Sequence, residues 1–177
     1  TVIIFSSDHG DNDASHRLEH KTTLYEEAAR VPFIVSWKGT LPGGNVDETH
    51  LVSNGLDLVP TICDLAGVAV ESDLPGRSVR PLLEGSAQPW RDALGVESEI
   101  GRMVVSADGL KYIRYDAVGI EERLHDLTTD PGETRHFTAE AEYAEKLDRM
   151  RSAFTEVGFT DTVECKDQND VNRVSMS

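Results

Sequence analysis

The sequence contains little cysteine and no long apolar run, and each shortage excludes a class of protein. Its two cysteines, Cys63 and Cys165, have no metal-ligand spacing and are too few for a disulfide-rich framework. Cys63 stands among apolar residues, which predicts a buried free thiol. No apolar segment approaches the roughly 18 residues that a membrane-spanning helix needs. We therefore expect a soluble chain with no membrane span.

Positive charge is also scarce. The 17 Lys and Arg residues face 32 Asp and Glu residues, which gives a formal net charge of −15. Because a surface of that sign repels polyanions, we expect no nucleic-acid partner and no anionic membrane partner. A small anionic substrate is not excluded, since one metal ion and one lysine can reverse the potential locally.

The sequence has no initiator methionine and no polar leader before its first apolar run. Thr1 already belongs to that run, residues 1–5. We therefore interpret the chain as the carboxyl-terminal part of a longer protein. Any targeting segment would then lie upstream, and the localisation stays unassigned.

The run at residues 1–5 predicts a buried strand of a parallel sheet, and Asp8, His9 and Gly10 follow it. In open α/β sheets, ligands bind at the carboxyl ends of strands. A carboxylate beside an imidazole at such an end predicts half of a divalent-metal site. The alternative is that Asp8 caps the loop while His9 packs there. Gly10 permits a positive φ or a close approach of the backbone to a ligand.

Two further polar residues follow in the next loop. Lys21 lies thirteen residues after Asp8 and could hold an anionic group bound to the metal, or could be a solvated surface lysine. His16 could donate a proton to a leaving-group oxygen, or could face solvent. Together with the metal couple, these residues indicate hydrolysis of a charged ester.

The first half of the chain also carries helix signals. Thr23 and Glu26 have the spacing of a capping box and predict a short helix. Residues 33–37 then form a second short apolar run, which predicts another buried strand. Asp57 is the expected N-cap of a longer helix, which Gly67 ends.

From Trp90 onward, short alternating runs are separated by turn residues, a pattern typical of an antiparallel meander. A final helix over residues 139–157 should pack on one face of this meander. Its apolar stripe consists of Tyr143, Leu147, Met150 and Phe154. We expect three regions: the α/β core at 1–88, an antiparallel-sheet-plus-helix subdomain at 89–159, and a polar tail at 160–177.

Several motifs occur together and in order. They are Asp8-His9-Gly10, Lys21-x-Thr23-Leu24-Tyr25-Glu26-Glu27-x-x-Arg30-Val31-Pro32, Leu74-Pro75-Gly76-Arg77-Ser78, Trp90-Arg91-Asp92 and Asp130-Pro131-Gly132-Glu133. With these motifs, residues 1 to about 157 resemble the second half of a sulfatase of the alkaline phosphatase superfamily. The resemblance implies an α/β fold. Part of an alkaline-phosphatase-like mixed sheet with helices would precede a small α+β subdomain, in which an antiparallel sheet carries one long C-terminal helix.

The resemblance also implies roles for the matched residues. Asp8 and His9 would be two ligands of one divalent cation, usually Ca²⁺ in this family, with Mn²⁺ or Mg²⁺ as alternatives because many members carry Asn where His9 stands. Lys21 would contact the sulfate group. His16 aligns with a histidine in a Gly-Glu-His-Gly-Leu stretch of many members, although Ser15 and Arg17 replace its flanking residues here.

The family's nucleophile is a formylglycine made from Cys/Ser-x-Pro-x-Arg in the amino-terminal half, and neither cysteine here begins such a motif. The resemblance therefore implies the C-terminal fragment of a sulfuric ester hydrolase, inactive alone, whose partners are the missing N-terminal half and a small-molecule or glycan sulfate ester. Two alternatives stay open. One is a phosphonate or phosphodiester hydrolase of the same superfamily, and the other is a non-catalytic module that binds a glycan or partner through the meander.

Overall fold

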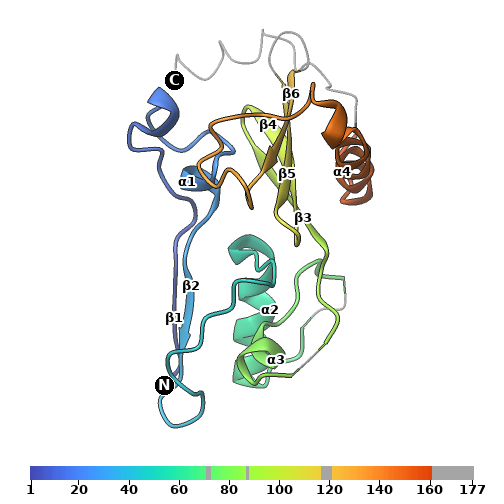
Figure 1. Cartoon of the computed structure of the whole chain (residues 1–177). Helices are drawn as coiled ribbons and strands as arrows, with labels where there is room; N and C mark the ends of the chain where they lie inside the picture. The colour runs from blue at the N-terminus through green and yellow to red at the C-terminus, as the bar shows by residue number, and fades with distance from the viewer. Residues whose placement is uncertain (71–72, 87, 117–120, 161–177) are drawn as a thin grey trace, which may run out of the picture.

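The structure is a computed structural model that describes residues 1–70, 73–86, 88–116 and 121–160, so the predicted tail lies outside the described residues except for Thr160. Figure 1 shows a long two-stranded ribbon beside a four-stranded sheet, with helices around both. The elements are β1 (Ile3–Ser6), a 3₁₀ turn (Ser15–Arg17), α1 (Glu26–Ala29), β2 (Phe33–Ser36), α2 (Asn54–Ala66), α3 (Arg80–Leu83), β3 (Ala93–Ser98), β4 (Gly101–Ser106), β5 (Leu110–Tyr115), β6 (Glu121–Asp126), a second 3₁₀ turn (Ala141–Tyr143) and α4 (Ala144–Glu156).

The first strand forms where the apolar run predicts it, but its pairing and burial differ from expectation. β1 pairs antiparallel with β2, in a register that places Ile3 opposite Ser36. Outward-facing side chains of the ribbon remain open to solvent, with Ile3 61% and Phe5 60% exposed. The expectation of a parallel strand buried on both faces is therefore wrong for the described chain. An apolar run indicates that burial would be favourable, but it does not specify which element buries it. Among the described residues, no element covers this face of the ribbon.

The predicted meander is confirmed. Strands β3, β4, β5 and β6 form one antiparallel sheet in sequence order. Side chains alternate between its two faces along each strand. Leu110 and Tyr112 of β5 therefore face one side, while Lys111 and Ile113 face the other. Lys111 lies directly opposite His125 of β6, so both side chains belong to the second face.

Helix α4 covers the first face, as its stripe predicts (Figure 1). The buried cluster here contains Val104, Leu110, Tyr112, Leu124, Phe137, Leu147, Met150 and Phe154. The Tyr112 and Phe154 rings meet edge to face, with centroids 5.4 Å apart. On the second face, Leu24 packs against Met103 and Ile113. The sheet is thus covered by α4 on one side and by the segment leading into α1 on the other.

The start of α1 is not capped as the sequence predicts. Its N-cap position is Tyr25, which makes no side-chain cap, and the Thr23 hydroxyl donates to Asn12 Oδ1 instead. The Glu26 amide donates to Glu133 Oε2 at 2.6 Å. The prediction of a capping box between Thr23 and Glu26 is therefore wrong. The carboxylate that satisfies this helix start comes from 107 residues further along the chain.

Helix α2 begins four residues earlier than expected. Ser53 is its N-cap and accepts a hydrogen bond from the Leu56 amide, so the prediction of Asp57 as N-cap is wrong. The Asp57 carboxylate is fully buried and binds the Arg91 guanidinium through both oxygens, at 2.5 and 2.6 Å. Gly67 ends the helix with φ 69°, as predicted. No helix in the described part of the chain is long and apolar enough to cross a membrane.

Candidate active site

Asp8 and His9 form a close polar couple just beyond the end of β1. Asp8 Oδ1 accepts hydrogen bonds from the His9 amide at 3.0 Å and from the Ser7 hydroxyl at 3.3 Å. Asp8 Oδ2 lies 3.4 Å from His9 Nε2. The hydrogen bond from the His9 amide lowers the pKa of the Asp8 carboxyl below its usual value. The carboxylate is 83% exposed, so it is ionised at neutral pH and accessible to an ion.

The geometry of this couple fits a divalent cation. His9 Nδ1 lies 2.7 Å from the Gly10 carbonyl oxygen, which can only accept, so Nδ1 carries the proton and Nε2 offers a lone pair. Two adjacent ligands about 2.4 Å from a Ca²⁺ ion lie roughly 3.4 Å apart when they meet at a right angle. The observed separation of 3.4 Å matches that spacing. Ca²⁺ takes six to eight ligands, mostly oxygens, whereas an imidazole nitrogen suits Mn²⁺ or Zn²⁺ better, so the couple supplies only part of a Ca²⁺ site.

Gly10 allows a close approach between two backbone segments of this chain, rather than between the backbone and a ligand. A Cβ at this position would lie 1.9 Å from the Glu27 carbonyl oxygen. The Gly10 amide also donates to the Ala28 carbonyl oxygen at 2.8 Å. The glycine thus joins the end of the Asp-His-Gly motif to α1. Asn54 of α2 makes a second contact with this segment, which the sequence did not predict: its side-chain amide donates a hydrogen bond to the Ser7 carbonyl oxygen.

The loop between the motif and α1 is closed by Asn12, which is fully buried. Its side-chain amide donates to the His20 carbonyl oxygen at 2.5 Å, and its oxygen accepts from the Thr23 hydroxyl at 2.9 Å. Lys21 lies between these two ties and is exposed. No contact within the described residues joins Lys21 to Asp8 or His9. Its convergence on the metal couple therefore stays a prediction.

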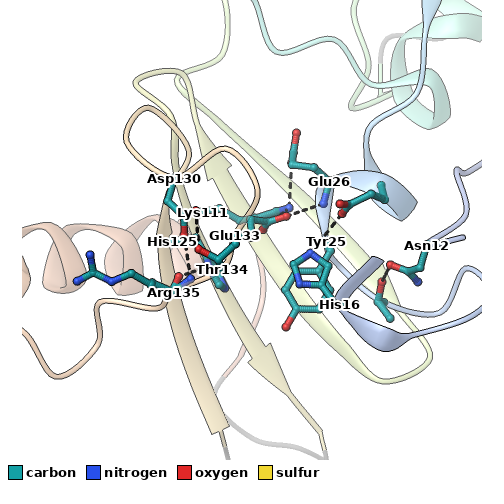
Figure 2. Close-up of polar contacts among 12 residues, drawn as sticks. Asn12, His16, Tyr25, Glu26, Lys111, His125, Asp130, Glu133, Thr134 and Arg135 are labelled. Carbon is teal, nitrogen blue, oxygen red and sulfur yellow. Dashed lines mark hydrogen bonds and ion pairs between the residues drawn. The ribbon is translucent and has the colours of Figure 1, made fainter. Parts of the chain in front are cut away.

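His16 faces a different group of residues (Figure 2). Its ring stacks on Tyr25 with centroids 3.8 Å apart and an interplanar angle of 9°. Its Nε2 lies 3.5 Å from Glu27 Oε2. The alternative that His16 simply faces solvent is wrong, because its side chain is only 16% exposed. The role of His16 in proton donation stays a prediction.

A buried ion cluster lies beside His16, on the second face of the sheet. Lys111 Nζ donates to Glu26 Oε1 and to Glu133 Oε1, both at 2.9 Å (Figure 2). Burial raises the pKa of the Glu133 carboxyl above its usual value, while Lys111 acts in the opposite direction. From the sequence, Glu133 is predicted to lie in a turn and Lys111 in a strand. Nothing local indicated that the two side chains meet.

Comparison with known proteins decides the family. Residues 14–158 match the sequence family described as N-sulphoglucosamine sulphohydrolase, C-terminal. The chain belongs to the sulfatase family. The resemblance to the carboxyl-terminal part of these enzymes, and the fold that it implies, are therefore confirmed.

The similar sulfatases include glycan-directed enzymes. The chain is 34% identical over 162 residues to the Delta 4,5-hexuronate-2-O-sulfatase of Bacteroides thetaiotaomicron, covering 86% of this chain and 33% of that protein. A solved structure of a 2-O GAG sulfatase superposes with a TM-score of 0.80 at 33% identity, covering 89% of this chain and 36% of that one. A protein solved in complex with its substrate D-glucosamine-2-N,6-O-disulfate has a TM-score of 0.80 at 28% identity, covering 89% of this chain and 34% of that one. The chain spans about a third of the length of these relatives.

Proposed function

We propose that this chain supplies the carboxyl-terminal half of the active site of a sulfuric ester hydrolase. The observation that carries the proposal is the Asp8–His9 couple, whose free carboxylate oxygen and ring nitrogen lie 3.4 Å apart at the end of β1. A divalent ion held there, Ca²⁺ in the first instance, would act as a Lewis acid on a sulfate oxygen. Lys21 would place its ammonium against the remaining sulfate oxygens.

The rest of the active site would come from outside this chain. The proposal assigns the formylglycine nucleophile and the other metal carboxylates to the amino-terminal half of the protein. The exposed face of the β1–β2 ribbon, with Ile3, Phe5 and Ile34 each more than half exposed, supports such an arrangement because it offers an apolar surface to cover. The chain alone should then bind a cation weakly and hydrolyse nothing.

The proposed substrate class is a sulfate ester on a glycan. Its support is that the similar proteins include a hexuronate-2-O-sulfatase and a 2-O GAG sulfatase. The net charge of −15 does not oppose it, since the local ion and Lys21 determine the potential that the sulfate meets.

Cation binding tests the proposal on the chain itself. Calorimetric titration with Ca²⁺ should show binding with a dissociation constant of about 1 mM or weaker, the range of sites with few charged ligands. Asp8→Asn should abolish it, because the variant removes an anionic ligand. Asp148→Asn is the matched control, since Asp148 is a 76% exposed carboxylate on α4. Unchanged binding by Asp8→Asn would reject the proposed metal couple.

The reaction class is tested on the full-length protein. Turnover of an aryl sulfate should exceed turnover of a phosphonate monoester at equal concentration, and the reverse result would favour the phosphonate hydrolase. Lys21→Met should lower sulfatase turnover by about 10²–10³, the effect of removing one donor to a developing oxyanion.

Titration of the chain with sulfated oligosaccharides tests the alternative that the chain is a non-catalytic binding module. Affinity that survives Asp8→Ala would support the module instead.

A further inference from the structure

A second set of metal-ligand atoms lies away from Asp8 and His9. His16, Glu27 and Glu133 each offer one ligand atom, and these atoms all lie within 4.8 Å of one another. The residues come from distant parts of the chain. His16 is in the 3₁₀ turn, Glu27 is in α1 and Glu133 is in the loop that follows β6. The set therefore joins the amino-terminal segment to the four-stranded sheet.

One member of the set has no hydrogen-bond partner. Glu27 Oε2 is hidden from solvent, yet within the described part of the chain it accepts no hydrogen bond. The Glu27 side chain as a whole is 34% exposed, so the burial concerns this one oxygen. A buried carboxylate oxygen without a donor is costly, and a nearby cation or proton would stabilise it. The group at ion-pair distance from it is the His16 imidazole.

The charges of the cluster also favour a cation. Glu26, Glu27 and Glu133 contribute three carboxylates, while Lys111 contributes one buried ammonium that is bound to Glu26 and Glu133. Arg30 approaches Glu26 at 3.8 Å, but its side chain is 75% exposed and so adds little. With all three carboxylates ionised the net charge is −2, which a divalent cation beside Glu27 would balance.

The separation of His16 and Glu27 agrees better with a shared metal ion than with a proton on His16. A protonated imidazole that bonds a carboxylate brings nitrogen and oxygen to about 2.7–2.9 Å. Two ligands about 2.1 Å from a tetrahedral ion lie roughly 3.4 Å apart. His16 Nε2 and Glu27 Oε2 are separated by 3.5 Å, longer than that hydrogen bond and close to the spacing of two ligands of one ion, and all three ligand atoms of the set lie within 4.8 Å of one another.

The ligands are also held in orientation by neighbouring groups. The His16 ring stacks on Tyr25 (Figure 2). The Tyr25 hydroxyl in turn accepts a hydrogen bond from Arg123 at 2.6 Å. The Glu133 carboxylate is fully buried and is positioned by the Glu26 amide and by Lys111. Such supporting contacts are a regular feature of protein metal sites, where they fix ligand geometry.

We propose that His16, Glu27 and Glu133 bind one Zn²⁺ ion at a structural site between α1 and the sheet. One imidazole nitrogen with two carboxylate oxygens suits Zn²⁺, with Mn²⁺ as the nearest substitute. The site is separate from the proposed active site and does not depend on it. It gives His16 a role as ligand in place of proton donor.

Calorimetric titration of the whole chain with Zn²⁺ tests this site. Wild type should bind one ion tightly, apart from any weak binding at Asp8 and His9, and should show a higher melting temperature in Zn²⁺ than in a chelator, because a ligand of the folded state stabilises it. Glu27→Gln should weaken binding by about 100-fold, since even the loss of a supporting residue costs 10–100-fold. Glu142→Gln, at an exposed position, should bind as wild type does.

His16→Phe provides a second variant, because it keeps a ring on Tyr25 and removes the nitrogen. Its matched control is His136→Phe, at an exposed histidine. Circular dichroism verifies that each variant folds, and Glu27→Gln decides the result if His16→Phe does not fold. All variants keep both cysteines, so any thiol contribution cancels in the comparison.

A double variant, Asp8→Ala with His9→Ala, separates this inference from the proposed function. It should retain Zn²⁺ binding at the wild-type affinity. Wild-type affinity in Glu27→Gln, or the absence of saturable binding in wild type, would overturn the structural site. Binding that is lost in the double variant and kept in Glu27→Gln would place the ion on Asp8 and His9, overturning this inference while supporting the active-site proposal.

Discussion

Lys111 Nζ lies 2.9 Å from Glu133 Oε1, and neither side chain has any exposure to solvent. The same carboxylate accepts the amide of Glu26 at the start of α1. One buried ion pair therefore connects a central strand of the sheet, the turn after β6 and the helix that follows the Lys21 loop. The cluster explains how the amino-terminal segment is held on the second face of the sheet.

Replacing Lys111 by Met should strongly destabilise the chain. The variant leaves Glu133 buried without its cation, a change that costs about 3–5 kcal/mol of unfolding free energy. Urea denaturation followed by circular dichroism measures this. Lys38→Met is the control, because Lys38 is exposed and surface substitutions stay within about 0.5 kcal/mol. Equal effects of the two variants would show that the ion pair contributes nothing specific.

Replacing Gly10 by Ala should destabilise the join between the Asp-His-Gly motif and α1. The new Cβ would lie 1.9 Å from the Glu27 carbonyl oxygen, so the backbone must move. Overpacking of this kind costs about 1–3 kcal/mol. Gly55→Ala in α2 is the matched control. Its nearest atom would lie 3.9 Å away, and alanine favours a helix, so no loss of stability is expected there. Thermal unfolding of the two variants tests the difference.

The buried Asp57–Arg91 pair should contribute far more than an exposed pair of the same kind. Asp57→Asn removes the charge that faces a 10% exposed guanidinium, and we expect a loss of about 3–5 kcal/mol. Asp64→Asn is the control, because the Asp64–Arg80 pair is 35% and 40% exposed and such pairs contribute about 0–1 kcal/mol. Similar losses in guanidinium denaturation would contradict the argument from burial.

Stability should fall in mild acid because of His125. Burial lowers the pKa of His125 to about 4 from 6.5. The contact of Nδ1 with the Arg135 carbonyl oxygen, at 2.7 Å, acts in the opposite direction and raises the pKa. Burial outweighs it, and a proton on Nε2 would have no acceptor among the described residues, so the neutral form is favoured.

The folded pKa lies below the unfolded one, so between pH 6.5 and pH 4 the unfolded chain binds the extra proton. Stability is complete above pH 6.5 and falls on the order of 3 kcal/mol as the pH drops to about 4. His125→Asn, whose amide can still donate to Arg135, should flatten this part of the pH profile. A variant profile parallel to that of wild type would assign the acid sensitivity to other groups.

Much of the secondary structure was predictable because local pattern determines it. The alternation after Trp90 predicted the four-stranded meander, and the stripe from Tyr143 to Phe154 predicted which face of α4 is buried. Gly67 marked the end of α2 through its left-handed φ, which glycine adopts at little cost. These signals depend on residues only a few positions apart, so they can be read from the sequence without knowing the tertiary contacts.

The errors share one physical cause. Thr23 and Asp57 have the residue types of helix caps, but Thr23 binds Asn12, and Asp57 binds Arg91. Each polar group binds a partner from another part of the fold, which only the tertiary structure brings close. The pairing of β1 also depended on a contact with β2, which an apolar run alone cannot specify.

The amino-acid sequence by itself determined the family, the order of the elements and the adjacency of Asp8 and His9, because these depend on residue type and spacing along the chain. Only the tertiary structure decided that Glu133 would complete the start of α1, that Lys111 would be buried between two carboxylates, and that His16 would face Glu27. Those contacts join residues up to 107 positions apart, and their energies come from burial and charge pairing that exist only once the sheet has formed.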